Sequence, residues 1–390
     1  MTSTVDTAAV RKETELRRRR LAAVRRLVVK IGSSSLTTAS HQLDRRVLRQ
    51  LVADVVELRH RGVEVAIVSS GAVAAGMGRL RQSRRPRMIA RLQAVAAVGQ
   101  IQLMEAYKGL FWRSRVPVGQ VLLTADDILG DRRRYLNLEN TLRSLFAYGA
   151  VPVINENDSI AVAELKRQIG ENDMLAAYVT NLIGAQLLIM LSDVDGLYAE
   201  YPVQRPGSRP LRLVQASDSD VLRPDDRPGS SVGRGGIATK LKAARLLLTC
   251  GEMCMIAHAR HHRLVDLLDG QDYGTLFVPA AKPLRRRKRW IAFASECAGS
   301  IVVDPGAQRA LVQHDSSLLP AGVLRLSGRF APGDAVRVMN ADGDEFARGL
   351  VRYSDTELAR IMGKTSPHVV AELGRPALEV IHRDDLVLLI

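Results

Sequence analysis

Cysteine is scarce in this chain, which contains only Cys250, Cys254 and Cys297. Their odd number and their spacing argue against a disulfide framework, so we expect free thiols in a reducing cytoplasm. A histidine-rich segment, HARHHR at 258–263, brings no cysteine or acidic residue at the spacing of a metal site. We therefore interpret that segment as a solvated loop and predict no metal-binding residues.

Long apolar runs are also missing, and none approaches the ~20 residues that a membrane-spanning helix needs. The N-terminal residues MTSTVDTAAVRKETELRRRR lack the apolar core of a secretion signal. We therefore expect no membrane segment and a cytoplasmic location. Residues 1–26 are predicted to form a disordered basic extension.

Two well-known kinase signatures are absent as well. The stretch SVGRGGIATKLK places three glycines before a lysine, but Gly236 stands only four residues before Lys240, and Leu241 follows. The spacing of a P-loop is therefore not met. The segment HRDD at 382–385 resembles a protein-kinase catalytic loop, yet the chain contains no D-F-G motif. Any phosphate site must belong to another architecture.

Positive charge is concentrated in three short segments of a chain whose formal net charge is +15. Residues 1–26 carry eight basic and three acidic side chains, and residues 79–91 carry six arginines without an acid. Residues 282–289 carry six basic side chains without an acid. The rest of the chain is slightly acidic, so we interpret these segments as a solvated tail, a solvated loop and a basic linker at 280–289.

Apolar runs and helical patterns alternate between residues 27 and 279. Buried strands are predicted at 27–31, 63–72, 116–123, 151–156, 185–192 and 252–257, and helices at 43–61, 88–108, 132–148, 171–183 and 237–250. This alternation predicts an α/β domain with a mostly parallel sheet and helices on both faces. Ligands of such sheets bind beyond the carboxyl ends of the strands, so the residues there are the candidates for a site.

The pattern of the sequence changes near Trp290. Short β-rich runs follow, separated by turns such as APGD and ADGD, with two brief helical patterns at 305–313 and 355–362. This pattern predicts a second, mostly β domain at 290–390, with the size and spacing of a small barrel.

The first two predicted strands end in turns that suit an anion. Lys30 stands at the end of the first strand, and that strand is followed by GSSS, whose backbone N–H groups can cradle phosphate oxygens. Ser69, Ser70 and Gly71 end the second strand in the same manner. A strand-closing lysine can also be only a solvated charge, and a serine before a helix can be an N-cap.

Polar side chains gather at further strand and helix ends. INENDSIA places Asn155 at the end of an apolar strand and Asp158 just beyond it, and GENDM places Asn172 and Asp173 at a helix start. These side chains can bind polar groups of a ligand, and Asp173 can hold lysines. Asx turns and a favourable helix dipole are the structural alternatives.

Two more strand or helix ends complete the set. Ser192 and Asp193 in LSDVDGLY follow another strand, although the DG pair is also a common turn. Lys240 opens a helix after the glycine-rich turn. Exposed N–H groups, the helix dipole and a full positive charge together attract a phosphate there.

Six segments stand in the order seen in bacterial glutamate 5-kinases, which the chain resembles: VVKIGSSSL, VSSGAVAAG, VGQVLLTADD, VPVINENDSIA, LSDVDGLY and GRGGIATKLKAA. The similarity continues through DSSLLPAG and VIHRDDLVL, and it covers about residues 27–390. The resemblance implies an amino-acid-kinase fold at 27–279, a three-layer α/β/α sandwich. It also implies a PUA-like β barrel at 290–390.

The same resemblance implies an activity. The chain would use ATP and Mg²⁺ to phosphorylate the side-chain carboxylate of L-glutamate, the first step of proline biosynthesis. Inhibition by proline and a homo-oligomer, either a dimer or a tetramer, are implied in the same way. A glutamate carboxylate, with a reference pKa of about 4.3, is ionised at neutral pH and needs no general base. Positioning and charge neutralisation would then carry the reaction.

Residue roles follow from the resemblance, position by position. Lys30 and Lys240 would clamp the transferred phosphoryl group, and Asp173 would orient both lysines. The residues that would hold glutamate are Ser70, Asn155, Asp158 and Asn172. The residues that would bind ATP are Lys30, Gly32, Ser33, Ser192, Asp193, Arg234, Gly235, Gly236, Ile237, Ala238, Thr239 and Lys240.

Three positions depart from the family pattern. Glu171 stands where the family more often has aspartate, and Arg234 occupies a position that is usually small. The segment AHARHHR replaces a glycine-bearing turn. None of these departures removes a residue assigned above, but each could alter affinity or regulation.

Two alternatives remain open. Another amino-acid kinase could act on aspartate, acetylglutamate or a nucleoside monophosphate. However, an aspartokinase-like chain should begin with KFGG, where this one has KIGSS, and a uridylate-kinase-like chain should end near residues 250–280. The second alternative is RNA binding by the PUA-like domain. From Trp290 onward there are ten basic and thirteen acidic residues, so we expect no nucleic-acid face.

Overall fold

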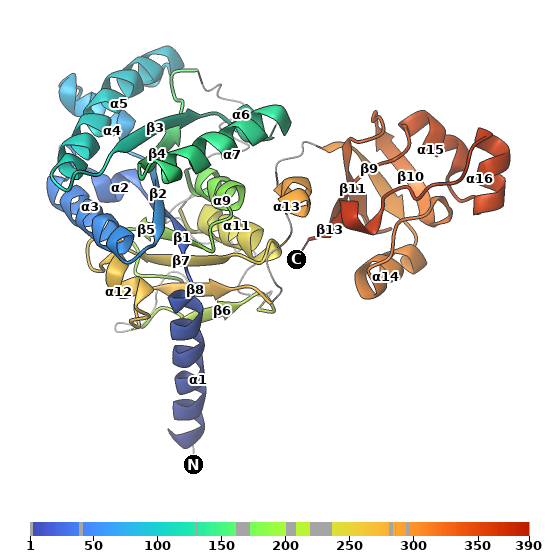
Figure 1. Cartoon of the computed structure of the whole chain (residues 1–390), viewed down its shortest axis with the longest axis horizontal. Coiled ribbons are helices and arrows are strands. Elements are labelled where there is room, and N and C mark those ends of the chain that lie inside the picture. Colours follow the sequence, from blue (N-terminus) through green and yellow to red (C-terminus); the bar gives the residue numbers. More distant parts are fainter. Residues whose placement is uncertain are drawn as a thin grey trace. The chain divides into compact units, whose positions relative to one another are not determined.

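The computed structural model describes residues 3–38, 42–129, 132–160, 172–199, 208–218, 236–280, 284, 286–293 and 297–389. The chain divides into two compact units, one made of residues 1–128 and 133–282 and the other of residues 129–132 and 283–390 (Figure 1). Among the described helices, none combines the length and the apolar character that crossing a bilayer requires.

An eight-stranded sheet forms the centre of the first unit, in the order β3-β4-β2-β1-β5-β7-β8-β6. The strands are β1 (Arg26–Ile31), β2 (Glu64–Ser69), β3 (Val118–Leu123), β4 (Val151–Glu156), β5 (Leu187–Ser192), β6 (Leu213–Gln215), β7 (Met253–His258) and β8 (Thr275–Val278). Neighbours are parallel except β7 and β8. The carboxyl ends of β4, β2, β1, β5 and β7 therefore lie along one edge.

Helices cover both faces of this sheet. Leu27, Val29 and Ile31 of β1 share a core with α3 (Arg45–His60), α5 (Ile89–Trp112) and α12 (Leu264–Leu268). Because side chains alternate along a strand, Val28 and Lys30 point to the opposite face. There, α9 (Asn172–Ile183) contacts β1, and α11 (Gly236–Thr249) packs beside α9 (Figure 1). Alternation thus directs Lys30 toward α9.

The predicted α/β architecture is confirmed. Each of the six predicted strands has its counterpart in β1 to β5 and β7, and the five predicted helices correspond to α3, α5, α7 (Arg132–Ala147), α9 and α11. The sequence did not predict β6 or β8, nor the short helices α2 (Ser33–Leu36) and α6 (Ala125–Leu129). These elements have three to five residues, too few for a periodic pattern to register.

The pair of helices α4 (Ala72–Arg79) and α5 shows why glycine is needed at one crossing. A Cβ on Gly99 would lie 1.7 Å from the carbonyl oxygen of Ala72, and one on Gly76 would lie 1.9 Å from that of Val95. The two backbones can touch only because both positions lack a side chain. This contact brings α5 against the first turn of α4, at the carboxyl end of β2.

The N-terminus differs from the prediction of a disordered extension. Residues Ser3–Ala22 form helix α1. Its Arg17 is buried and donates hydrogen bonds to the carbonyl oxygens of Arg212 (2.9 Å), Gly274 (3.3 Å) and Tyr273. Burial lowers the pKa of Arg17 to about 10, so the side chain remains cationic at neutral pH. Composition could not reveal this docking, because the partners are carbonyl groups far along the chain.

The second unit contains a five-stranded sheet in the order β10-β9-β11-β12-β13. Its strands are β9 (Cys297–Val303), β10 (Val323–Gly328), β11 (Ala335–Met339), β12 (Glu345–Leu350) and β13 (Leu386–Leu388), and its helices are α13 (Arg286–Phe293), α14 (Pro305–His314), α15 (Asp355–Ile361) and α16 (Ser366–Leu373). The predicted mostly β domain is confirmed, and α14 and α15 match the two predicted helical patterns. Helix α13 takes up the end of the segment predicted as a linker.

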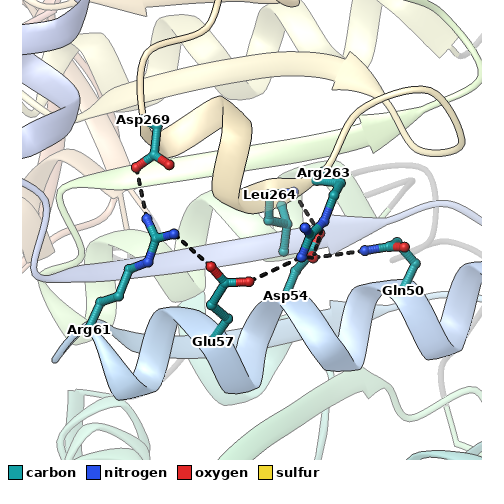
Figure 2. A network of polar contacts seen from close by, with 7 residues as sticks. All are labelled: Gln50, Asp54, Glu57, Arg61, Arg263, Leu264 and Asp269. Carbon is teal, nitrogen blue, oxygen red and sulfur yellow. Dashed lines mark hydrogen bonds and ion pairs between the residues drawn. The ribbon is translucent and has the colours of Figure 1, made fainter.

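A polar network ties helix α3 to the segment that follows β7 (Figure 2). The buried Asp54 accepts hydrogen bonds from Gln50 Nε2 (2.9 Å), from Arg263 Nη2 (2.7 Å) and Nε (3.0 Å), and from the backbone N–H of Leu264 (2.8 Å). Arg263 Nη2 also contacts Glu57 at 3.1 Å. Asp54 thereby fixes the first residue of α12 and the loop before it.

Replacing Asp54 with alanine should lower the unfolding free energy by about 1–3 kcal/mol, because the buried Leu264 N–H loses its acceptor and Arg263 loses the carboxylate oxygen that accepts from its Nε and Nη2. Urea denaturation of the purified variant measures this change. Glu57→Ala is the matched control, since it removes an exposed partner of the same arginine and should cost much less. Equal losses in the two variants would show that Asp54 does not anchor the loop.

Candidate active site

Two lysines from distant parts of the chain meet at one buried carboxylate. Lys30 Nζ lies 2.6 Å from Asp173 Oδ1, and Lys240 Nζ lies 3.2 Å from Asp173 Oδ2. Asp173 is fully buried, and each lysine is 7% exposed. Because all three groups are buried, each charge must stay close to an opposite one, since an unpaired buried charge would be costly in free energy. We call these three residues the lysine–aspartate cluster.

The elements explain how the cluster forms. Lys30 is the penultimate residue of β1, and Asp173 is the second residue of α9. Lys240 lies in the first turns of α11, where its Nζ also donates to the carbonyl oxygen of Gly236 at 2.9 Å. Thr239 Oγ1 donates to Asp173 Oδ2 at 3.1 Å. A strand end and two helix starts therefore converge at the carboxyl edge of the sheet.

The charges around Asp173 determine its ionisation. Burial by itself would raise the pKa of Asp173, but the charges of Lys30 and Lys240, together with their hydrogen bonds, outweigh burial and lower that pKa. The carboxylate is therefore ionised at neutral pH. It holds the two ammonium groups within 3.2 Å of its oxygens, and so keeps two positive charges side by side at the strand ends.

The residues that were predicted to bind the substrate L-glutamate form a second group beside the cluster. Asn172 Nδ2 donates to Ser70 Oγ at 2.6 Å and to Asn155 Oδ1 at 3.3 Å. Asn172 precedes Asp173 in the chain, so this hydrogen-bonded group adjoins the cluster directly. Asp158 is half-buried in the turn that follows β4, three residues beyond Asn155. The structure thus brings Ser70, Asn155 and Asn172 together, as the sequence predicted.

The described residues that were predicted to bind ATP lie in and after β1, at the end of β5 and at the start of α11. Gly32 follows the last residue of β1, and a Cβ there would lie 3.6 Å from Lys30 Nζ, while Ser33 is exposed at the start of α2. Ser192 Oγ donates to Asp193 Oδ1 at 3.0 Å, at the end of β5. The residues Gly236, Ile237, Ala238, Thr239 and Lys240 form the first turns of α11. Arg234 and Gly235, like Glu171, lie outside the described residues.

The histidine-rich segment needs a correction, because an acidic side chain does lie beside it. Strands β5 and β7 pair with Ser192 opposite His258, which brings Asp195 to the histidines. His261 Nδ1 lies 3.4 Å from Asp195 Oδ1, and candidate ligand atoms of Asp195, His258 and His261 lie within 4.8 Å of one another. The segment is otherwise solvated, since Arg260, His261 and Arg263 are exposed, and the His258 and His261 rings stack with centroids 3.7 Å apart.

This arrangement is not a prepared metal site. The backbone N–H of Arg260 donates to His258 Nδ1 at 3.0 Å. A neutral imidazole that accepts at Nδ1 carries its proton on Nε2, and then neither nitrogen offers a free lone pair. Burial, followed by the charge of His261, lowers the pKa of His258 and favours this neutral form.

The sequence analysis missed two residues of α5 near the site, Tyr107 and Gln100. Ser69 Oγ lies 3.0 Å from the hydroxyl of the buried Tyr107, and Gln100 Oε1 accepts a hydrogen bond from Asn155 Nδ2 at 2.9 Å. Both partners come from α5. The helical pattern of this segment placed them in a helix, but periodicity does not reveal which helical residues reach a strand end.

The fold and the cluster together define an α/β protein with a buried pair of lysine ammonium groups at the carboxyl edge of its sheet. The model of the amino acid kinase family matches residues 25–258, and that of the PUA domain matches residues 299–373. The glutamate 5-kinase of Citrifermentans bemidjiense is 47% identical over 376 residues, which cover 96% of this chain and 100% of that relative.

Further relatives agree. The glutamate 5-kinases of Geobacter sulfurreducens and Trichormus variabilis are each 44% identical, over 95% and 93% of this chain and 99% of each relative. Among solved structures, carbamate kinase from Giardia lamblia bound to AMP-PNP has a TM-score of 0.46 at 15% identity, covering 66% of this chain and 99% of that one. The chain belongs to the amino acid kinase family and, within it, to the glutamate 5-kinases, which confirms the resemblance found in the sequence.

Proposed function

We propose that the chain transfers the γ-phosphoryl group of ATP to the side-chain carboxylate of L-glutamate and forms L-glutamyl 5-phosphate, the first step of proline biosynthesis. The relatives named glutamate 5-kinase, aligned over nearly the whole chain, support this assignment. The observation that carries the mechanism is the lysine–aspartate cluster, in which two buried ammonium groups share one carboxylate.

The cluster answers the main difficulty of this reaction. The acceptor is an ionised carboxylate that must approach the negatively charged phosphates of ATP, and it needs no base to remove a proton. Fixed positive charge at the point where the two anions meet lowers the barrier, because it stabilises charge that moves during transfer. Lys30 approaches from β1 and Lys240 from α11, and Asp173 keeps both in place. Ser70, Asn155, Asp158 and Asn172 hold the acceptor.

ATP is the phosphoryl donor in this proposal, bound by the turn after β1, the end of β5 and the start of α11. Mg²⁺ usually keeps several waters and binds to phosphate oxygens rather than to a protein cage. The buried carboxylate of the cluster is occupied by both lysines, so the described cluster residues do not form a carboxylate site for the ion. The lysines themselves supply the charge neutralisation described above.

The first experiment measures ADP release by the purified full-length chain with L-glutamate, L-aspartate, N-acetylglutamate or uridine monophosphate as acceptor. We expect release with L-glutamate alone, and lower release when proline is added, because proline is a small amino acid that can compete for the same pocket. Release with another acceptor and none with glutamate would overturn the assignment.

Sedimentation of the same sample tests the proposed dimer or tetramer.

Asp158→Ala should raise the KM for L-glutamate by roughly 10-fold or more, because a carboxylate is the natural partner of the substrate ammonium group. The KM for ATP serves as the internal control and should stay within about two-fold, since Asp158 follows β4 and the nucleotide residues lie around β1, β5 and α11. A change in the KM for ATP alone would place Asp158 on the nucleotide instead.

A further inference from the structure

A chain of amide side chains runs from α5 to the lysine–aspartate cluster, and one backbone group fixes its direction. The N–H of Glu156 donates to Asn155 Oδ1 at 2.9 Å. A backbone N–H can only donate, so the oxygen of the Asn155 amide must face it and Nδ2 must point the other way. Asn155 Nδ2 in turn donates to Gln100 Oε1 at 2.9 Å. The amide of Gln100 is therefore oriented as well.

This orientation leaves one donor unused. Gln100 Nε2 is buried, and it has no hydrogen-bond partner within the described part of the chain. Because Gln100 Oε1 accepts from Asn155 Nδ2, exchanging the oxygen and nitrogen of the Gln100 amide would break that hydrogen bond, so the unpaired donor cannot be explained by a flipped amide. Gly99 explains how the group reaches the strand ends, since the glycine lets α5 touch the first turn of α4.

The opposite end of the chain of amides leaves one acceptor unused. Asn172 Nδ2 points to Ser70 Oγ (2.6 Å), Asn155 Oδ1 (3.3 Å) and the carbonyl oxygen of Ser69 (3.5 Å). Three acceptors surround this nitrogen, which fixes the amide with Oδ1 on the other side. Asn172 Oδ1 is buried, and among the described residues it too has no hydrogen-bond partner.

Buried polar atoms without partners are rare in folded proteins, and each requires an explanation. Here a donor and an acceptor stand at the two ends of one hydrogen-bonded group, and the residue that carries the acceptor, Asn172, directly precedes Asp173 of the lysine–aspartate cluster. The α-carbon of an amino acid carries the complementary pair, a carboxylate that accepts and an ammonium group that donates. The α-groups of such a ligand thus offer the acceptor and the donor that these two atoms lack.

We propose that Gln100 is a substrate-specificity residue whose Nε2 donates a hydrogen bond to the α-carboxylate of the acceptor amino acid, while Asn172 Oδ1 accepts one from its α-ammonium group. This inference rests on the proposed function. The order of the strands determines which way round the amino acid binds, because β2 separates β4 from β1. Two strand spacings, about 10 Å, separate Asn155 on β4 from Lys30 on β1. The α-groups therefore bind at Gln100 and the side-chain carboxylate faces the lysines.

Two substitutions separate this role from a merely structural one. Gln100→Glu keeps an oxygen that accepts from Asn155 Nδ2, but it replaces the unused donor by a negative charge. Gln100→Met removes both the acceptor and the donor at similar length. If Gln100 only supports Asn155, Gln100→Glu is harmless and Gln100→Met is not. If Gln100 binds the α-carboxylate, Gln100→Glu is the more damaging change, because a carboxylate then faces a carboxylate.

The experiment measures L-glutamate binding to the full-length variants by calorimetry, and the KM values for glutamate and ATP. We expect Gln100→Glu to weaken glutamate binding on the order of 100-fold and Gln100→Met on the order of 10-fold, with the KM for ATP within about two-fold. Gln102→Glu adds the same charge to the same helix and should leave glutamate binding unchanged. 4-Aminobutyrate, which lacks the α-carboxylate, should inhibit the wild type and Gln100→Glu at similar concentrations.

Wild-type affinity in Gln100→Glu, or a loss in Gln100→Met alone, would overturn the assignment of Gln100 while leaving the proposed function intact. Equal weakening of glutamate and 4-aminobutyrate in Gln100→Glu would also overturn it. A wild-type chain that neither binds nor phosphorylates L-glutamate would instead refute the proposed function, and the inference with it. The two failures are thus distinguished by the wild-type measurement.

Discussion

Lys240→Ala is expected to lower kcat by about 10²-fold or more, the loss that typically follows removal of a preorganised group that stabilises the transition state. The side chain is almost completely buried, and its ammonium group reaches Asp173 Oδ2 from the first turns of α11. Lys30 cannot take its place, because Lys30 is held on the other carboxylate oxygen. Lys30→Ala should have an effect of the same order, for the same reason.

The measurement is steady-state ADP release at saturating ATP and L-glutamate. Lys242→Ala is the matched control, since it removes an exposed lysine two residues further along the same helix and should keep kcat within about two-fold. Lys240→Arg should not restore the rate, because a planar guanidinium does not reproduce a compact ammonium charge. A folded Lys240→Ala enzyme with a near-normal kcat would remove this lysine from the mechanism.

The sequence predicted the location of the site better than its internal connections. Lys30, Asn155 and Ser192 each lie in the last two residues of an apolar strand, and the carboxyl ends of parallel strands share one edge, so their proximity followed from the strand pattern. The helix starts singled out Lys240 and Asp173, and the family resemblance then assigned both to one clamp with Lys30. Neither argument could show that one carboxylate holds both lysines on opposite oxygens, because that depends on how α9 and α11 pack.

Contacts across large sequence separations were the main omissions. Gln100 lies in the middle of α5, where helical periodicity does not distinguish a side chain that reaches β4 from one that stays at the surface. Asp195 was not associated with His258 because they are neighbours only through the pairing of β5 with β7. Arg17 was assigned to a disordered tail, since composition does not reveal that a charged side chain will find buried carbonyl groups. Each of these depends on topology rather than on local pattern.

The second large effect is expected on the stability of the fold, when the carboxylate of the lysine–aspartate cluster is removed. Asp173→Asn preserves the shape of the side chain but leaves two buried ammonium groups without a counter-charge. Breaking a buried ion pair in this way should lower the unfolding free energy by about 3–5 kcal/mol at pH 7, as well as reducing kcat. Asp269→Asn, which removes an exposed carboxylate paired with Arg61, is the control and should cost about 1 kcal/mol or less.

The pH dependence tests the cause of this loss. The folded-state pKa of Asp173 is lowered, so its contribution to stability is fully present above the unfolded pKa of about 4 and disappears as the pH falls through the lower folded value. The difference in unfolding free energy between the wild type and Asp173→Asn should therefore be largest at neutral pH and shrink below about pH 4. Urea denaturation at a series of pH values measures it. A difference that stays constant with pH would mean that Asp173 supports the fold through its shape and hydrogen bonds, and that its charge does not hold the lysines together.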